Sequence, residues 1–258
     1  MAQKRKQLEN GAPRLLPRLS FVKRVWLSSA LAVPVALAVA AEHRTIDAGE
    51  SVRGRTIVAR LQGKEDASTR VLAVGQIHGD EPGGLRVIHA LRGMRVPRSV
   101  ALWTVRSVNP DGARLRIRRN VRGVDLNRNF PRGWRKSPRG SRYYGGRRSL
   151  SEPESRAGAR LIRQLRPRVT IWFHQPYGFV VETPSADRRV WRRYARLAGT
   201  STARLPRYPG TATRWQNHRF PRSDAFVVEL PGGRISAATA RRHARAVLEL
   251  ARWLSRAA

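Results

Sequence analysis

Residues 71–84, VLAVGQIHGDEPGG, combine a structural signal with a chemical one. The apolar run at 71–74 has strand character, and it leads through Gly75 into a turn that contains three further glycines. That turn carries His78 and Glu81, three residues apart. Imidazole and carboxylate are ligand types that zinc hydrolases use, and the glycines keep the turn open. The stretch therefore predicts half of a zinc site at the mouth of a strand.

Outward from this stretch, strand-like and helix-like segments alternate along the chain. Strands are expected at 56–61, 71–77, 101–107, 169–173, 179–182 and 225–230. Helices are expected at 82–92, 153–165, 188–198 and 237–256. Residues 131–148, rich in Gly, Arg, Ser and Tyr, are expected to form a long surface loop. This alternation predicts an α/β fold whose sheet is covered by helices on both faces.

The composition is strongly basic and contains no cysteine. The 258-residue chain has 52 Lys+Arg against 17 Asp+Glu, a net charge of +35, and only five of the basic residues are lysines. Such a surface suits nucleic acid, acidic membrane or an anionic polymer. The alternative is a general preference for arginine over lysine, which the scatter of arginines along the chain favours. The absence of cysteine excludes disulfides, thiolate catalysis and cysteine-ligated zinc, so histidine and carboxylate must hold any metal.

The N-terminal residues 1–41 differ from the remainder. Residues 1–24 are basic, and residues 25–41 form an uncharged apolar run of 17 residues that ends in small side chains. This order predicts a cleaved secretory signal, with an uncleaved membrane anchor as the alternative. In both cases the flanking positive charges direct the rest of the chain outward. We therefore expect a secreted or extracytoplasmic protein with one catalytic domain at 42–258, which contacts membrane only through its N-terminal segment.

A third metal ligand is needed, and His174 is the candidate. It follows the apolar strand expected at 169–173, at the end of the strand where ligands gather in open α/β sheets. Taken alone, His174 is more simply a structural residue, but together with His78 and Glu81 the metal role is favoured. The other histidines are expected in a linker, in two helices and in a polar loop: His43, His89, His243 and His218.

Glu229 is the candidate general base. It lies near the end of the strand expected at 225–230, which a Pro-Gly-Gly turn follows. A carboxylate at the end of a buried strand needs a partner or a catalytic task. A base of this kind takes a proton from the attacking water and passes it to the leaving amine. The alternative is a glutamate that pairs with a surface arginine.

The segment 118–131, RRNVRGVDLNRNFP, is the candidate substrate-binding segment. Asn127 and Arg128 are adjacent, and the planar fork of arginine matches a carboxylate. The arginines upstream are suited to polarising a carbonyl and stabilising its oxyanion. The alternative is a basic loop with an Asn-rich turn.

Six short motifs occur in one order along residues 71–233. They are IHGDEPGG at 77–84, NPDG at 109–112, GVDLNRNFP at 123–131, SEPE at 151–154, FHQP at 173–176 and VVELPGG at 227–233. Together they resemble the carboxypeptidase A-like zinc metallopeptidases. The chain is most similar to the small bacterial branch that includes murein peptide amidase and gamma-D-glutamyl–diaminopimelate peptidases. The resemblance implies a mixed, mostly parallel central sheet flanked by helices on both faces.

The resemblance also implies roles for individual residues. It implies that one Zn²⁺ ion is bound by His78, Glu81 and His174, and that Glu229 acts as general base and acid. The S-x-x-E form of Ser151–Glu154, by contrast, we interpret from the residues themselves as a capping box at a helix start.

For substrate binding, the resemblance implies that Asn127 and Arg128 hold the terminal carboxylate. Arg118 is the choice for the carbonyl-polarising arginine, by its offset from GVDLNRN, although Arg119 and Arg122 are close by. The aromatic lid residue of the family has two candidates here, Tyr208 and Trp215.

We therefore expect a zinc-dependent metallopeptidase that hydrolyses an amide bond next to a free carboxylate, in peptide or murein-peptide substrates. The basic exterior makes an anionic cell-wall polymer a further candidate partner, whereas nucleic acid is not expected. The alternative is a non-catalytic cationic binding protein, for cell wall or nucleic acid, on a peptidase-like scaffold.

Overall fold

A computed structural model describes residues 44–256, so the expected signal or anchor at 1–41 lies outside the described residues. The strands are β1 (Thr45–Glu50), β2 (Thr56–Gly63), β3 (Thr69–Val74), β4 (Val100–Val105), β5 (Val169–His174), β6 (Phe179–Val181), β7 (Ser201–Ala203) and β8 (Asp224–Glu229). The helices are α1 (Gly83–Arg92), α2 (Pro110–Leu115), α3 (Pro153–Leu165), α4 (Arg188–Ala198), α5 (Ala212–Arg219) and α6 (Ala237–Leu254). A short 3₁₀ turn, η1, spans Leu126–Arg128.

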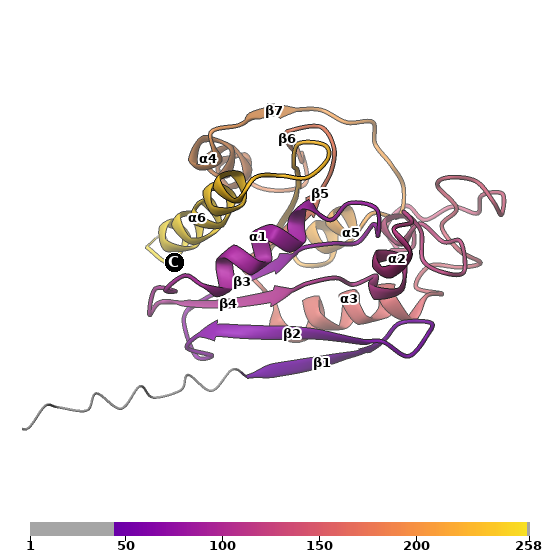
Figure 1. The fold of residues 1–258 in the computed structure, drawn as a ribbon, viewed down its shortest axis with the longest axis horizontal. Coiled ribbons are helices and arrows are strands. Elements are labelled where there is room, and N and C mark those ends of the chain that lie inside the picture. Colours follow the sequence, from indigo (N-terminus) through magenta and orange to yellow (C-terminus); the bar gives the residue numbers. More distant parts are fainter. Residues whose placement is uncertain (1–43, 257–258) are drawn as a thin grey trace, which may run out of the picture. The chain divides into compact units, whose positions relative to one another are not determined.

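The strands form one sheet in the order β1-β2-β4-β3-β5-β8-β6-β7 (Figure 1). The central strands β4, β3, β5 and β8 are parallel to their neighbours within this group. Strands β1 and β2 add an antiparallel edge, and β6 joins β8 antiparallel. The predicted mixed, mostly parallel sheet is therefore confirmed.

Alternate residues of the central strands pack against helices on opposite faces. Val71 and Ala73 belong to the core beneath α1, α4 and α6, whereas Leu72 and Val74 belong to the core beneath α3 and α5. This is the two-residue period of a strand with two buried faces. Figure 1 shows α1 and α6 on one side of the sheet and α3 on the other. The expected covering of both faces is confirmed.

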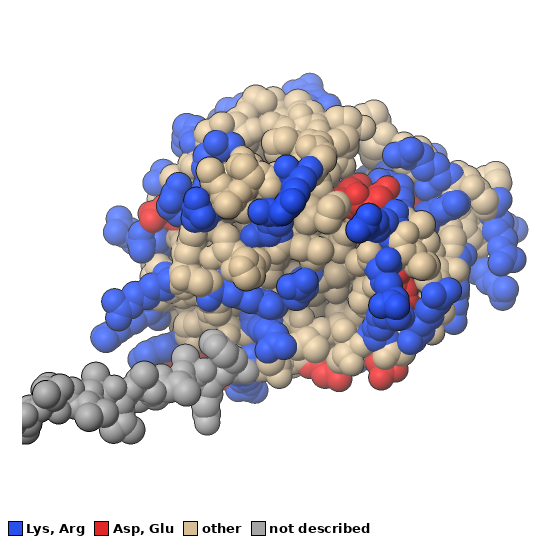
Figure 2. Space-filling view, in the orientation of Figure 1, with Lys and Arg blue, Asp and Glu red and all other residues tan. Residues whose placement is uncertain are grey.

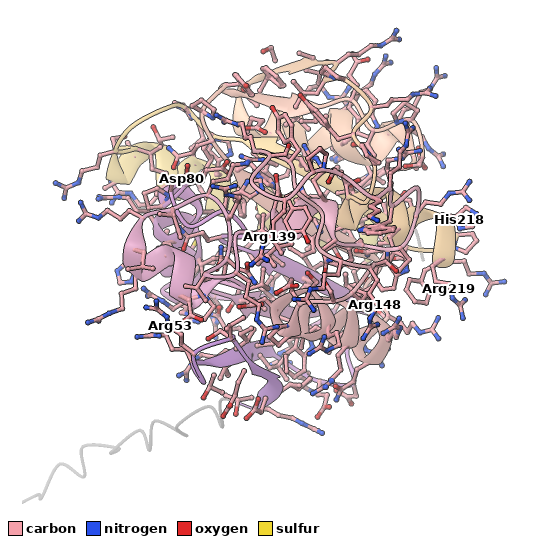
Figure 3. All side chains as sticks on the ribbon, turned by 90° about the vertical axis from the view of Figure 1, so that its right-hand side faces the viewer. Arg53, Asp80, Arg139, Arg148, His218 and Arg219 are labelled. Carbon is pink, nitrogen blue, oxygen red and sulfur yellow. The ribbon has the colours of Figure 1, made fainter. Side chains whose placement is uncertain are left out.

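Four short elements were not predicted: β1, β7, α2 and α5. The strands β1 and β7 are edge strands with a single fully buried residue between them, so neither carries an apolar run. Helix α5 begins at Thr211, whose side chain accepts a hydrogen bond from the Arg214 amide. The prediction that His218 lies in a loop is wrong, because His218 and Arg219 form the exposed end of α5 (Figure 3).

The predicted capping box at 151–154 is also wrong. Helix α3 does begin there, but its N-cap residue is Glu152, and no side chain caps the first turn. The two carboxylates instead accept hydrogen bonds from the buried Asn120 amide, at 2.9 Å for Glu152 and 3.1 Å for Glu154. The long-range partner outcompetes the local one because Asn120 is buried beside the helix start.

Residues 131–148 contain no helix or strand, as predicted. Figure 3 views the molecule from the side that carries this loop, on which Arg139 and Arg148 are labelled. Within residues 44–256, no helix combines the length and the apolar character that crossing a membrane requires.

Candidate active site

The site lies where three neighbouring parallel strands end. His78 and Glu81 follow β3, His174 is the last residue of β5, and Glu229 is the last residue of β8. Strands β3, β5 and β8 are adjacent, and His174 lies opposite Glu229 in their register. The carboxyl ends of parallel strands meet at one edge of a sheet, which is where such folds place their ligands. The order of the strands therefore brings together residues that are about 150 positions apart in the chain.

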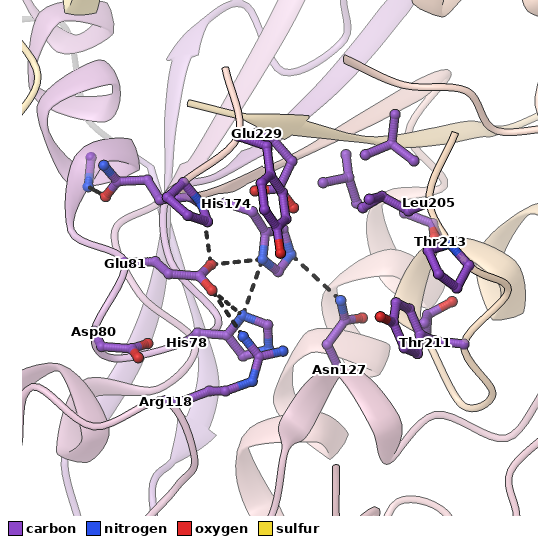
Figure 4. A pocket seen from close by; sticks show the side chains of 18 of the residues that line it. His78, Asp80, Glu81, Arg118, Asn127, His174, Leu205, Thr211, Thr213 and Glu229 are labelled. Carbon is purple, nitrogen blue, oxygen red and sulfur yellow. Dashed lines mark hydrogen bonds and ion pairs between the residues drawn. The ribbon is translucent and has the colours of Figure 1, made fainter. Parts of the chain in front are cut away.

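Three of these side chains converge on one point (Figure 4). Nδ1 of His78 lies 2.8 Å from Oε1 of Glu81, and Nδ1 of His174 lies 2.8 Å from Oε2 of the same carboxylate. The two Nδ1 atoms are 3.1 Å apart. All three side chains are buried. Two imidazole nitrogens this close need either a hydrogen atom shared in a hydrogen bond or a metal ion between them, and three such side chains around one point suit a metal ion.

Asp125 contacts the nitrogen of His78 that points away from the other two side chains. Its Oδ1 atom lies 3.0 Å from Nε2 of His78, and the aspartate is fully buried. This contact fixes the ring and leaves Nδ1 to face Glu81 and His174. The motif GVDLNRNFP contains Asp125, but only Asn127 and Arg128 of this motif were predicted to have a role.

The electrostatic field at this point favours positive charge. Burial acts to lower the pKa of His78, but the carboxylates of Glu81 and Asp125 outweigh burial and raise this pKa to about 9. Burial acts in the opposite direction on the two acids, yet the adjacent His78 holds the pKa of each carboxyl well below its usual range. A metal ion competes with protons for ligand atoms of this kind. Two histidines and one carboxylate match the donor set of catalytic zinc centres, so these residues fit a divalent metal ion.

Glu229 faces the same cleft without a partner. It is 6% exposed, and its Oε2 atom has no hydrogen-bond partner among the described residues. Burial raises the pKa of this carboxyl, and the charge of Glu81 adds to the effect, while His174 opposes it. A buried carboxylate oxygen with no partner in this part of the chain is available to accept a proton from a bound molecule.

Arg118 is the arginine that faces this centre. Its Nη1 atom donates to Oε1 of Glu81 at 3.0 Å, and its Nη2 atom donates to Oδ2 of Asp125 at 3.1 Å. Arg119 instead donates to carbonyls of the 131–148 loop, and Arg122 has an exposed side chain 3.7 Å from Glu152. Of the three arginines weighed from the sequence, the structure places only Arg118 along the cleft.

Asn127 and Arg128 lie on η1. Oδ1 of Asn127 accepts a hydrogen bond from the amide of Ala212 at 3.0 Å, which joins η1 to the start of α5. Arg128 donates from Nη1 to the carbonyl of Asn127 at 2.7 Å, while its buried Nε has no partner in the part of the chain described. Arg128 therefore keeps N–H donors for a bound anion.

All seven residues singled out from the sequence line one cleft of about 1380 Å³. Of the two candidates for the aromatic lid, Tyr208 lines this cleft. Trp215 does not, because it is 5% exposed and packs against Phe130 and Phe220 in the core. The Trp215 alternative is therefore wrong.

Residues 38–214 match the family model described as zinc carboxypeptidase, which is more than half of the chain. The chain belongs to the zinc carboxypeptidase family. The match includes the three candidate metal ligands, Arg118, Asn127 and Arg128, and it ends before Glu229.

Relatives and solved structures of this family agree with that assignment. Murein peptide amidase A from Escherichia coli K12 is 28% identical over 156 residues, which is 56% of this chain and 64% of that protein. The alignment therefore spans less than two thirds of the relative. The crystal structure of murein-tripeptide amidase MpaA from Escherichia coli O157 matches with a TM-score of 0.65 at 27% identity, over 81% of this chain and 92% of that one. Carboxypeptidase A from Helicoverpa armigera shares the fold, with a TM-score of 0.70 at 18% identity over 84% of this chain and 69% of that one.

Gln175, a residue not predicted from the sequence, connects two parts of the site in this member of the zinc carboxypeptidase family. Its Oε1 atom accepts from the amide of Gly83 at 2.7 Å, and its Nε2 atom donates to the carbonyls of Pro231 and Gly233 at 2.6 and 2.8 Å. One buried amide therefore ties the start of α1, after Glu81, to the turn after Glu229. The FHQP motif includes this glutamine, but nothing in the sequence identifies its distant partners.

Proposed function

We propose that this protein is a zinc-dependent metallopeptidase that hydrolyses an amide bond next to a free carboxylate in murein-derived peptides. The observation that carries the proposal is one cleft that holds a buried His-Glu-His cluster, with a glutamate and an arginine that keep polar atoms without partners among residues 44–256. Membership of the zinc carboxypeptidase family supports the reaction class. The names of the murein peptide amidase relatives support the substrate class.

His78, Glu81 and His174 would hold the zinc ion. Zinc, when bound in such a site, supplies Lewis-acid polarisation of a carbonyl and makes water more acidic. Asp125 keeps His78 in the orientation that presents Nδ1. Family membership and the donor set support zinc as the metal.

The remaining residues bind the substrate and move protons. Arg128 and Asn127 seat the substrate's free carboxylate, which would accept from N–H groups of Arg128 that the contact with the Asn127 carbonyl leaves free. Arg118 uses three N–H groups on Glu81 and Asp125, which leaves two for the oxygen of the scissile carbonyl. Glu229 takes the proton from the attacking water and delivers it to the departing amine.

The charge of the cleft supports an anionic substrate. Its rim carries arginines for which no ion pair with a carboxylate is recorded within residues 44–256: Arg86, Arg142, Arg207, Arg214 and Arg234. Murein peptides bear several carboxylates, which these side chains would attract. Figure 2 shows that basic residues also spread over the visible face outside the cleft. Because these basic residues would attract negative charge, we include an anionic cell-wall polymer as a second partner, bound more weakly than the peptide.

The substrate is tested by product analysis. Zinc-loaded protein is incubated with L-Ala-gamma-D-Glu-diaminopimelate, with its C-terminal amide, and with an ordinary L-dipeptide, and the products are identified by mass spectrometry. We expect release of diaminopimelate from the free acid and much slower cleavage of the amide. A chelator should abolish turnover, and added Zn²⁺ should restore it. Equal turnover of the L-dipeptide would contradict the murein assignment, and turnover in the presence of the chelator would contradict the zinc mechanism.

Export is part of the proposal, on the basis of the basic stretch and the apolar run at 25–41. Fractionation of cells that express the full chain, beside cells that express residues 42–258, tests it. The full chain should appear outside the cytoplasm or on the membrane, and the shortened chain should stay inside. The same location for both would contradict export by this segment.

A further inference from the structure

The guanidinium of Arg128 lies against two tyrosine rings that come from different loops and contact each other. Its Cζ atom is 4.1 Å from the ring centre of Tyr208 and 5.1 Å from that of Tyr143. The rings are in contact with each other, with centroids 5.4 Å apart and planes inclined by 36°. Both tyrosines line the cleft. Tyr208 was a candidate from the sequence, whereas Tyr143 was assigned no role.

The partners of Arg128 are unusual for a buried arginine. It is 6% exposed, yet no ion pair to a carboxylate is recorded for it within residues 44–256, and its Nε lacks a hydrogen-bond partner there. A carboxylate partner would compete with the substrate's own carboxylate for the same N–H groups. An aromatic face attracts the cation without accepting these hydrogen bonds. The two rings therefore hold the charge in place and leave its donors free.

Tyr143 is firmly placed although 40% of it is exposed. Its backbone amide donates to Oγ of Ser141 at 3.2 Å. The following residue, Tyr144, accepts at its carbonyl from the amide of Asp125 at 2.8 Å. Trp134 closes the loop by donating from Nε1 to the carbonyl of Gly145 at 2.8 Å. The loop 131–148 is thereby fastened to Asp125, which also holds His78.

We propose that Tyr143 is a substrate-positioning residue, which together with Tyr208 forms an aromatic surface that holds the Arg128 guanidinium, so that its free donors meet the substrate's carboxylate. This inference rests on the proposed function of the cleft. It makes the 131–148 loop a part of the carboxylate-binding site, next to Tyr208.

The test compares three variants by KM and kcat. Tyr143→Leu keeps apolar bulk but removes the aromatic face, so KM for L-Ala-gamma-D-Glu-diaminopimelate should rise about five- to tenfold with little change in kcat. Tyr143→Phe keeps the face and should stay within about twofold of the wild type. Arg139→Ala, an exposed residue of the same loop, is the matched control and should match the wild type.

A C-terminally amidated substrate separates positioning from a general structural effect. The KM for this amide should be about the same in the wild type and in Tyr143→Leu, because the amide lacks the terminal carboxylate that Arg128 holds. An unchanged KM for the free acid in Tyr143→Leu would overturn the proposal. So would an equal rise in KM for the acid and the amide, or a Tyr143→Phe variant as weak as Tyr143→Leu.

Binding measurements distinguish this proposal from the proposed function. Calorimetry of the same tripeptide on the zinc-loaded proteins reports its Kd without requiring turnover of the substrate. If the wild type binds but does not hydrolyse the peptide, the proposed function fails while the Kd values still decide the role of Tyr143. We expect Tyr143→Leu to weaken Kd by the same factor as KM, and an unchanged Kd would overturn the inference.

Discussion

Nε2 of His78 lies 3.0 Å from Oδ1 of Asp125, and this contact crosses 47 positions of the chain. The carboxylate fixes the ring, so that Nδ1 faces the other two donors. Asp125→Asn keeps the shape but weakens this hold on the ring. We expect zinc affinity to fall by about 10- to 100-fold, since partners of ligand histidines have effects of this size.

Competition with a chelator of known affinity measures this change directly. Asp66→Asn, at an exposed aspartate away from the cleft, is the control and should bind zinc as the wild type does. An Asp125→Asn variant with unaltered zinc affinity would show that the contact does not support the metal site.

Arg118 should act on the chemical step. Replacing it with Ala removes donors at the position where charge develops on the carbonyl oxygen, so kcat should fall about 10²- to 10³-fold. Arg122→Ala removes an exposed arginine four positions away and should leave kcat within about twofold. Steady-state kinetics on the murein tripeptide measure kcat for both variants. Equal losses in the two variants would mean that the charge of the loop, and not the position of Arg118, is what matters.

Gln175 should contribute to stability through three hydrogen bonds. Gln175→Met keeps the volume but leaves the Gly83 amide and the carbonyls of Pro231 and Gly233 without their partner. The free energy of unfolding should fall by about 3 kcal/mol. Urea denaturation of the metal-free proteins at pH 7 measures it, with the exposed Gln164→Met as control. A loss below about 0.5 kcal/mol would contradict the bracing role.

His243 should make the fold sensitive to acid. Burial, with a contribution from Arg242, lowers the pKa of this histidine to about 4, and its Nδ1 lies 3.0 Å from the hydroxyl of Tyr194. Between the ordinary pKa of about 6.5 and this value, the unfolded chain binds a proton that the folded chain does not. The free energy of unfolding therefore falls as the pH drops through this window, by about 3 kcal/mol at pH 4.

Denaturation curves at pH 7 and pH 4.5 for the wild type and for His243→Gln test this. The variant should lose most of the pH dependence that His243 contributes, whereas His218→Gln, at the exposed end of α5, should keep it. If the free energy of unfolding of His243→Gln falls between pH 7 and pH 4.5 by as much as that of the wild type, other groups cause the acid sensitivity.

The positions of the candidate site residues follow from patterns that the sequence displays. Apolar strands that end in His174 or Glu229, and a glycine-rich turn with His78, indicate positions at one edge of a parallel sheet. Adjacent strands then bring these side chains together, whatever their separation in the chain. The alternation of strand-like and helix-like segments can also be read from short stretches of sequence. This is why the fold class was predicted correctly.

Contacts between distant segments were not predictable in this way. Asp125, Gln175 and Tyr143 act through partners on other loops, and their own neighbours in sequence do not mark them. The capping box at 151–154 failed for the same reason, since Asn120 donates to the Glu154 carboxylate that a local rule assigns to the helix start. A helix as short as α5 also lacks the repeated apolar pattern on which its detection depends.

The most direct test of the account measures zinc content and turnover on the same samples of the wild type and Glu229→Gln. Glu229 is buried, faces the cleft and lacks a hydrogen-bond partner at Oε2 in the described structure, so removing its charge should leave the metal ligands intact. We predict one zinc ion per chain in both proteins, with hydrolysis of L-Ala-gamma-D-Glu-diaminopimelate falling by at least about 10²-fold in the variant. Normal hydrolysis by Glu229→Gln, or a wild type that neither retains zinc nor cleaves the peptide, would contradict the account.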